Sequence, residues 1–226
     1  AADLAGGAGK VIDYAARELQ LAEPARFSPP AGAHALPFTL ADRMPIVQGE
    51  LDGIALAISV DTGSRASLTL HSPFVREHEL VAKYHAAPES VLGWGVGGAA
   101  RGRAARLGTL RLGDLALHGV AGDLFTGDKG AFAGADLGGN LGGGVLRRFT
   151  VAFDYAGRTM YLAPNEAFAQ ADAFDRSGLW LLGAADALEV VDVAAGSAAQ
   201  QAGLRVGDRI TAIDGAVAAW ARLPAV

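Results

Sequence analysis

One acidic residue of this chain stands at the end of an apolar run. The run Gly53-Ile-Ala-Leu-Ala-Ile-Ser-Val60 leads directly into Asp61-Thr62-Gly63-Ser64. Such a strand delivers a carboxylate from a buried sheet into a tight turn, and burying a carboxylate is costly unless it is paired or hydrogen-bonded. The acid is therefore a candidate for general acid–base catalysis. The alternative is a strand that ends in an ordinary polar turn, since Asp, Gly and Ser are common turn residues.

The residues around this turn form short apolar runs separated by turn signals, which predicts a mainly β protein. The 31 glycines and 9 prolines among 226 residues favour sheet over long helices. Asp52-Gly53 is a hairpin signal, and residues 73–84 predict a helix with Ser72 as its N-cap. Strands are expected at residues 36–40, 45–51, 54–60, 67–70, 107–112, 115–120, 150–155 and 159–162.

Composition excludes several classes of function. The chain is 51% hydrophobic and 19% charged, which suits one or two packed domains. Its formal net charge is −5 and it has no basic block, so we expect no binding to nucleic acid or to anionic membranes. No apolar stretch is long enough for a transmembrane segment. The absence of cysteine excludes disulfides, thiolate catalysis and cysteine metal sites, and it fits either redox compartment.

A repeat links the two ends of the first 170 residues. Asp13-Tyr14-Ala15 recurs as Asp154-Tyr155-Ala156, an offset of 141 residues (154 − 13), which is the period of a domain. Residues 1–34 are therefore interpreted as the tail of a preceding lobe, or an N-terminal arm, followed by a linker. A chance likeness between two Asp-Tyr hairpins is the alternative. The same offset relates Arg17, Leu21 and Phe27 to Arg158, Leu162 and Phe168.

Three segments, in order, resemble a lobe of the aspartic protease family, in its retropepsin-like bacterial form. They are the strand into Asp61, the glycine-rich segment 93–98 where the family has its flap, and the segment 139–155, where it has an apolar-apolar-Gly element. The resemblance implies a closed β-barrel lobe with short helices over residues 35–170. The site residues it implies are Asp61, Thr62, Gly63 and Ser64 in the catalytic turn, Trp94, Gly95, Val96, Gly97 and Gly98 in the flap, and Asn140, Leu141 and Gly142 beside the turn.

The chemistry of this family needs two carboxylates that share one proton and hold a water between them. One acts as general base toward the water while the other acid polarises the scissile carbonyl. The resemblance assigns one of these roles to Asp61. It implies that Gly63 lets backbone N–H groups reach the acid, that Thr62 bonds across to the other lobe, and that the Ser64 hydroxyl steadies the acid from outside. Trp94 is either a flap contact to substrate or a packed aromatic.

The second carboxylate is expected from outside these residues. The chain has no further Asp-Thr-Gly or Asp-Ser-Gly motif, and the repeat would put the counterpart of Asp61 before residue 1. Its source is either a preceding lobe, which the repeat favours, or a symmetric second copy. The chain departs from the family at Asn140, where an aliphatic residue is expected. Arg65 either points to solvent or turns inward, where it would lower the pKa of the carboxylate pair.

Two further patterns are expected to be structural. Residues 93–98 also match the dinucleotide pattern Gly-x-Gly-x-x-Gly, but arginines and then a strand follow instead of a helix, so a mobile hairpin is favoured. His71, His78 and His85 recur every seven residues among charged neighbours. That pattern predicts a solvated helix face rather than a metal site. We therefore expect neither a metal nor a cofactor.

Residues 171–226 resemble a PDZ domain of the bacterial type. Residues 176–181 match its carboxylate-binding loop, and a strand, a short helix, a strand and a hairpin follow up to residue 215. Ser197 is expected to cap the helix and Gly203 to end it. The second helix and last strand of the family are not matched, so a small, incomplete β/α module is expected. A peptide would add as an extra strand on the loop residues Ser177, Gly178, Leu179, Trp180 and Leu181.

Two functions remain open after these comparisons of pattern. The first is an aspartic endopeptidase that hydrolyses a peptide or protein substrate with Asp61 and a second aspartate. The resemblance implies a location in the bacterial cell envelope, periplasmic or secreted. The second is a non-catalytic peptide-binding protein that keeps the protease-like scaffold and the PDZ-like module. The approach of another carboxylate to Asp61 distinguishes the two.

Overall fold

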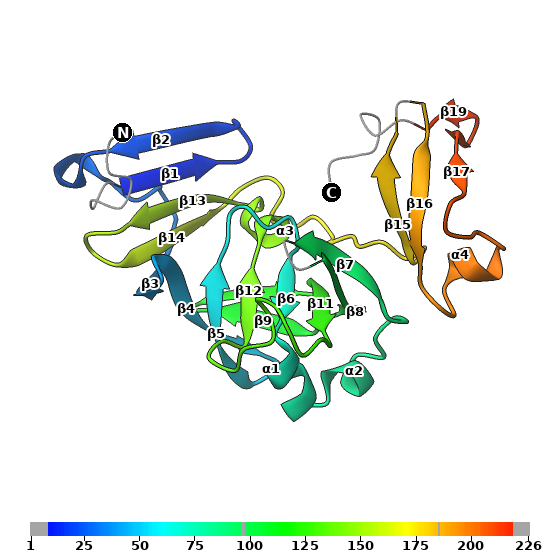
Figure 1. Cartoon of the computed structure of the whole chain (residues 1–226). Coiled ribbons are helices and arrows are strands. Elements are labelled where there is room, and N and C mark those ends of the chain that lie inside the picture. Colours follow the sequence, from blue (N-terminus) through cyan, green and yellow to red (C-terminus); the bar gives the residue numbers. More distant parts are fainter. Residues whose placement is uncertain (1–8, 96–97, 185, 219–226) are drawn as a thin grey trace.

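The computed structural model describes residues 9–95, 98–184 and 186–218, and these residues are mainly β (Figure 1). Short helices are η1 (Pro24–Arg26), α1 (Ser72–Glu77), α2 (Leu80–Lys83), α3 (Gly143–Leu146) and α4 (Ala198–Gln201). The strands are β1 (Gly9–Asp13), β2 (Glu18–Ala22), β3 (His34–Ala41), β4 (Met44–Leu51), β5 (Ile54–Val60), β6 (Leu68–Leu70), β7 (Ser90–Gly95), β8 (Gly98–Arg106), β9 (Thr109–Leu112), β10 (Leu115–His118), β11 (Ala121–Phe125), β12 (Gly139–Leu141), β13 (Phe149–Asp154), β14 (Thr159–Pro164), β15 (Leu179–Gly183), β16 (Leu188–Val193), β17 (Arg209–Ile210), β18 (Ala212–Ile213) and β19 (Ala216–Val217).

Fourteen strands join in one sheet whose order is β2-β1-β13-β14-β3-β4-β5-β12-β6-β11-β8-β7, with β9 and β10 attached through β4. The predicted closed barrel is wrong, because no hydrogen-bonded pair joins β2 to β7 in the described part of the chain. The sheet stays open because β1 and β2 extend it beyond β13, while the β7–β8 hairpin ends it on the other side.

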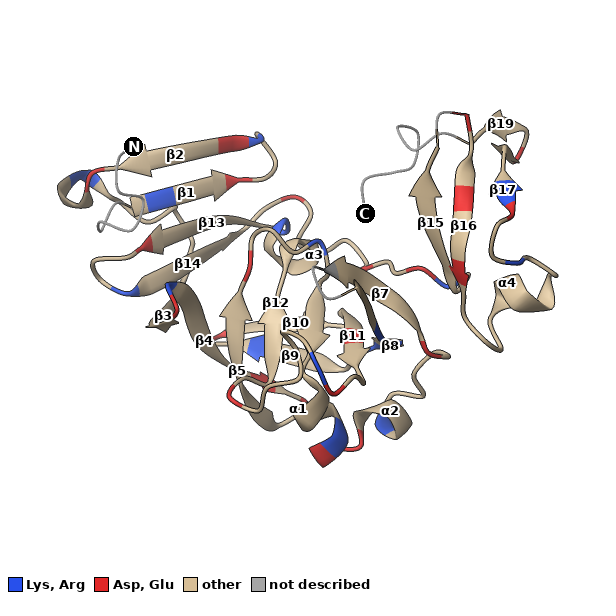
Figure 2. Ribbon diagram, in the orientation of Figure 1, with Lys and Arg blue, Asp and Glu red and all other residues tan. Residues whose placement is uncertain are grey.

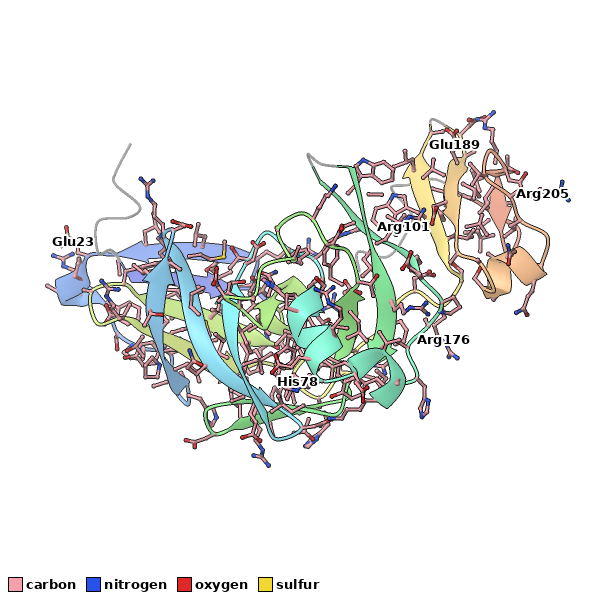
Figure 3. The ribbon with its side chains drawn as sticks, turned by 60° about the horizontal axis from the view of Figure 1, so that its bottom comes forward. Glu23, His78, Arg101, Arg176, Glu189 and Arg205 are labelled. Carbon is pink, nitrogen blue, oxygen red and sulfur yellow. The ribbon has the colours of Figure 1, made fainter. Side chains whose placement is uncertain are left out.

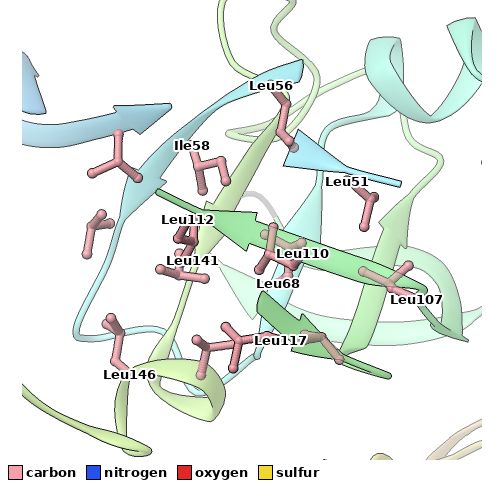
Figure 4. Close-up of a cluster of buried hydrophobic side chains, with 14 of the residues drawn as sticks. Leu51, Leu56, Ile58, Leu68, Leu107, Leu110, Leu112, Leu117, Leu141 and Leu146 are labelled. Atoms are coloured by element: carbon pink, nitrogen blue, oxygen red, sulfur yellow. The ribbon is translucent and has the colours of Figure 1, made fainter. Parts of the chain in front are cut away.

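Leucines fill the core where the strands around Asp61 pack against β9 and β10 (Figure 4). Ile58 precedes Asp61 by one turn of the strand alternation and is fully buried, as are Leu68, Leu110 and Leu141. Each such side chain contributes roughly 1.5–3 kcal/mol when it leaves water. This burial fixes the strand that carries the acid.

The helix predicted over residues 73–84 is interrupted. It forms as α1 and α2, because Glu79 adopts a left-handed conformation with φ 51° between them. The N-cap of α1 is His71 rather than the predicted Ser72, and its side chain makes no capping hydrogen bond.

Two hairpins share one geometry. β1 and β2 pair with Val11 opposite Gln20, and β13 and β14 pair with Ala152 opposite Tyr161, so both registers differ by 141 residues. Arg17 and Arg158, also 141 apart, both have positive φ, at 59° and 51°. In each turn an aspartate Oδ1 accepts a backbone N–H at 2.9 Å, from Ala16 to Asp13 and from Gly157 to Asp154. The sequence repeat is thus also a repeat of structure.

The two hairpins face each other across a local two-fold axis. β1 lies antiparallel to β13 with Val11 opposite Ala152, and these two residues are counterparts under the 141-residue shift. Lys10 faces Phe153 while Ile12 faces Val151, which is the exchange of counterparts that a two-fold axis requires. The axis passes between Val11 and Ala152.

The C-terminal segment forms a three-stranded sheet in the order β15-β16-β17, a short helix and the β18–β19 hairpin. The predicted helix signals are confirmed, since the Ser197 hydroxyl accepts the Gln200 N–H and Gly203 has φ 87°. Charged residues of both signs are interspersed along this segment and along the large sheet (Figure 2).

Candidate active site

Asp61 leaves β5 while its backbone is still paired with β12. Its N–H donates to the Leu141 carbonyl at 2.9 Å, so the sheet holds the backbone up to the acid itself. The predicted backbone bond is confirmed, because the Gly63 N–H donates to Asp61 Oδ1 at 2.9 Å. Asp61 is half-buried, while Thr62 and Gly63 are exposed. Within the described residues the carboxylate accepts no other hydrogen bond, and neither Thr62 nor Ser64 donates its hydroxyl to it.

A glycine-rich turn supports the catalytic turn from behind. The Gly143 N–H donates to the Ser64 carbonyl at 2.6 Å, and the Gly142 N–H donates to the Ser67 carbonyl at 3.1 Å. A Cβ at Gly142 would lie 2.3 Å from the Ala66 carbonyl oxygen, and one at Gly144 would lie 2.1 Å from the Ser67 hydroxyl. Only glycine allows the two turns to pack this closely.

Asn140 lies in β12, between β5 and β6, where an aliphatic residue was expected. Its Oδ1 accepts the Ser59 hydroxyl at 2.8 Å, and its Nδ2 has no acceptor among the described residues. Leu141 is fully buried beside it. The Ser59–Asn140 pair explains how a polar residue is accommodated in this strand.

Residues 90–106 form an antiparallel hairpin of β7 and β8, with Trp94 opposite Ala99 and Gly95 opposite Gly98. Trp94 is 63% exposed, so it is not a packed aromatic within the described residues. Val96 and Gly97, predicted as flap residues, lie outside the described residues. The hairpin is therefore a candidate flap with a large apolar side chain near its tip.

The PDZ-like segment contacts both the candidate flap and the catalytic turn. The guanidinium of Arg65 lies 5.6 Å from the centre of the Trp180 ring. Arg101 of β8 donates to the carboxylate of Asp192, and Figure 3 shows Arg101 between the hairpin and β15–β16. Trp180 and Asp192 are cross-strand partners. Arg65 is exposed but lies against an aromatic ring, which was not among the two expected orientations.

The predicted carboxylate-binding loop already holds a carboxylate. Asp175 accepts the N–H groups of Ser177 and Gly178 at 3.1 and 3.0 Å, and the Ser177 hydroxyl accepts the Leu179 N–H at 3.1 Å. β15 itself, with Trp180 and Leu181, is at the edge of its sheet. Strand addition by a peptide is geometrically open there, while the loop's N–H groups are partly occupied.

Sequence reasoning missed three acids. Asp172 lies in the segment after β14, fully buried, and bonds to the Ala121 N–H at 2.9 Å and to Arg148 at 3.3 Å. Burial raises the pKa of Asp123 to about 6, despite the charge of Arg65, which acts in the opposite direction. Asp123 sits in an unremarkable run, Ala121-Gly-Asp-Leu-Phe125, and the third acid is Asp175. Only strand register could have indicated that Asp123 shares a face with Asp61.

Neither a metal site nor a membrane span emerges from the part of the chain that the structure describes. No three residues among His, Asp and Glu gather there as metal ligands. The predicted histidine row is divided, since His71 is buried against Phe132 and His78 stacks on Phe74. Burial lowers the pKa of His71. No described helix is long and apolar enough to cross a bilayer.

Comparisons with known proteins give two likenesses. A family model described as a PDZ domain matches residues 189–219. The crystal structure of a retropepsin-like aspartic protease from Rickettsia conorii is similar at 16% sequence identity, covering 61% of this chain and 94% of that chain, with a TM-score of 0.41. No curated protein matches the chain. Both resemblances expected from the sequence are therefore found.

Proposed function

We propose that this chain carries one half of the catalytic pair of an aspartic endopeptidase, with Asp61 as the catalytic carboxylate. The observation that carries the proposal is the state of this acid. A buried strand presents it, one backbone N–H holds it, and the rest of its hydrogen-bonding capacity is available among the described residues. A structural aspartate in such a position is normally saturated with partners.

The reaction requires a second carboxylate facing Asp61. The two carboxylates share one proton because like charges at short range resist joint ionisation. One takes a proton from the bound water, whose oxygen attacks the peptide carbonyl, and the other acid donates a hydrogen bond to the carbonyl oxygen. In this scheme the Gly63 N–H orients Asp61, and the β7–β8 hairpin covers an extended peptide.

The second carboxylate comes from a lobe or subunit related to this one by a two-fold axis. The repeated hairpin supports a preceding lobe, because β1–β2 has the register and turn geometry of β13–β14. β1 also occupies the outer edge of β13, where a second copy would pair in a symmetric dimer. Residues 9–22 are then the last hairpin of the first lobe.

Exposed leucines on β2 give independent support. Leu19 and Leu21 are 64% and 54% exposed. Their counterparts 141 residues later, Met160 and Leu162, are fully buried in the core of the described lobe. Two apolar side chains on one face of an edge strand are costly in water. A preceding lobe of the same fold would bury them as Met160 and Leu162 are buried here.

Replacement of Asp61 tests the proposal. Peptide hydrolysis by the intact protein is measured across acidic pH for the wild type, for Asp61→Asn and for Asp114→Asn, an exposed aspartate in the turn between β9 and β10. We expect Asp61→Asn to lose at least about 1,000-fold in kcat, as expected when an essential acid–base group is removed, and Asp114→Asn to retain activity. Equal cleavage by the wild type and Asp61→Asn would leave a peptide-binding scaffold instead.

A further inference from the structure

Asp123 belongs to a row of polar side chains on the same face of the sheet as Asp61. Ser59 precedes Asp61 by two residues, so both side chains point to one face. Opposite residues in neighbouring strands also share a face. The register runs from Ser59 through Asn140 and Thr69 to Asp123. The opposite face carries Ile58, Val60, Leu68, Leu70, Leu124 and Leu141, all of them buried in the core.

Asp123 is the member of this row that a ligand can reach. Ser59, Thr69 and Asn140 are buried, whereas Asp123 keeps partial exposure. Its cross-strand neighbours on either side are Thr69 and Ala104, whose side chains are small. The next polar group along the row, Asn140 Nδ2, lacks an acceptor among the described residues.

The Asp123 carboxylate lacks a direct partner within the described residues. It accepts no hydrogen bond, and no cationic nitrogen lies within 4.0 Å of it in the ion pairs formed there. The charged groups that act on it are Arg65, just after the catalytic turn, and Asp172, which is itself paired with Arg148. Leaving a largely enclosed carboxylate without a counter-ion is unfavourable. A cation supplied by a ligand would remove that cost.

Asp123 is too distant to be the missing catalytic partner. Three strand spacings of roughly 4.8 Å separate β11 from β5, so the two backbones are about 14 Å apart. A carboxylate that faces the same side as Asp61 at this distance is placed for a substrate side chain rather than for the scissile bond.

We propose that Asp123 forms a subsite that selects a lysine or arginine side chain of the substrate peptide, a few residues from the bond that Asp61 cleaves. The inference rests on the proposed function for its substrate class. An extended peptide rises about 3.3 Å per residue, so 14 Å along the cleft corresponds to about two residues plus the reach of a long side chain. Arg65 competes weakly for the same carboxylate, and the substrate cation displaces its influence.

The subsite gives a pH-dependent preference. Burial keeps the pKa of Asp123 near 6, so the carboxylate is charged above that pH and neutral below it. Its facing groups are Arg65, Asp172, Thr69 and Ala104, of which Arg65 and Asp172 carry charge. Selection for a cationic residue is therefore strong at about pH 7 and weak at about pH 5.

Matched peptides test the subsite in the intact protein. Each pair differs only by lysine against norleucine, at one position scanned across the peptide. The kcat/KM ratio of each pair is measured for the wild type, Asp123→Asn and Asp114→Asn, at both pH values. In parallel, the affinity of both peptides is measured for an Asp61→Asn form with and without Asp123→Asn. Circular dichroism checks that each variant is folded.

At one position we expect a lysine preference of roughly 10- to 100-fold at the higher pH, the effect of one charge-assisted hydrogen bond. The preference falls at the lower pH and disappears in Asp123→Asn, while Asp114→Asn retains it. Equal handling of both peptides by the wild type, in rate and in affinity, overturns the subsite, as does a preference that survives Asp123→Asn. Cleavage that is independent of Asp61 refutes the proposed function instead, and the affinity measurements then still decide on the subsite.

Discussion

Two aspartates near the candidate site meet opposite fates. Asp172 is fully buried and satisfied by Arg148 and a backbone N–H, so it stabilises the segment that leaves β14. Asp61 is held by one backbone N–H and keeps free hydrogen-bonding capacity among the described residues. A saturated acid has no capacity for a water or a second carboxylate, whereas Asp61 does. This difference in partners, rather than the Asp-Thr-Gly motif, distinguishes a chemical role from a structural one.

Asp52 carries a prediction on stability. It accepts hydrogen bonds from the Thr109 N–H at 2.6 Å and the Tyr84 hydroxyl at 2.8 Å, and Lys83 lies 3.4 Å away. Burial acts to raise the pKa of Asp52, but these donors and the Lys83 charge outweigh it and hold the pKa below its usual value. We expect Asp52→Ala to cost about 1–2 kcal/mol of unfolding free energy. Asp52→Asn costs less, since asparagine keeps an acceptor and tolerates the φ of 49°.

The same residue sets a pH dependence. A lowered pKa in the folded state means that the stabilisation is present above the unfolded pKa of about 3.9 and is lost as pH falls through the folded value. Urea unfolding of the wild type and Asp52→Asn between about pH 3 and pH 6 measures it. The difference in stability between the two proteins should shrink toward the acid end. A constant difference over this range would contradict the assignment.

At the scale of elements, close packing of two turns holds the acid in place. A Cβ at Gly142 would meet the backbone carbonyls of Ala66 and Ser64 at 2.3 and 2.9 Å, and these atoms cannot rotate away. We expect Gly142→Ala to lower stability by about 1–3 kcal/mol, because the backbone must shift. The matched control is Gly134→Ala, where a Cβ meets nothing within 4 Å, and its effect should stay within about 0.5 kcal/mol. Thermal unfolding of both variants, with equal losses as the contrary result, decides the point.

Local pattern predicted elements well where one face of a strand is apolar. β5 spans Ile54–Val60, as expected from the run before Asp61, because alternation and the Asp52-Gly53 turn fix both of its ends. The helix over residues 73–84 failed at Glu79, since a left-handed residue is a backbone choice made by tertiary packing. The role of Asp123 was not predictable either. It depends on which strands become neighbours, and β11 lies three places from β5 in the sheet.

The same limit holds for the whole molecule. The 141-residue repeat was visible in the sequence, but the closed barrel expected from the family resemblance did not form. The reason is the pairing of β1 with β13, which extends the sheet outward. Nothing in either strand's own sequence specifies that the two copies of one hairpin should pair with each other. The two-fold axis between Val11 and Ala152 is a property of the assembled sheet.

Removal of the first hairpin tests whether this axis builds the site. Deleting residues 1–22 uncovers the edge of β13, and an exposed edge with unpaired N–H and C=O groups pairs readily with an identical strand. We expect the shortened chain to dimerise about the same axis, with β13 against β13, which brings two Asp61 side chains to one centre. Light scattering on a sizing column measures the change in mass. Peptide cleavage that appears with the dimer and disappears in Asp61→Asn would connect the axis to catalysis. A folded, monomeric shortened chain would refute the role of β1 as a cover for this edge, because β13 would then stay unpaired without consequence.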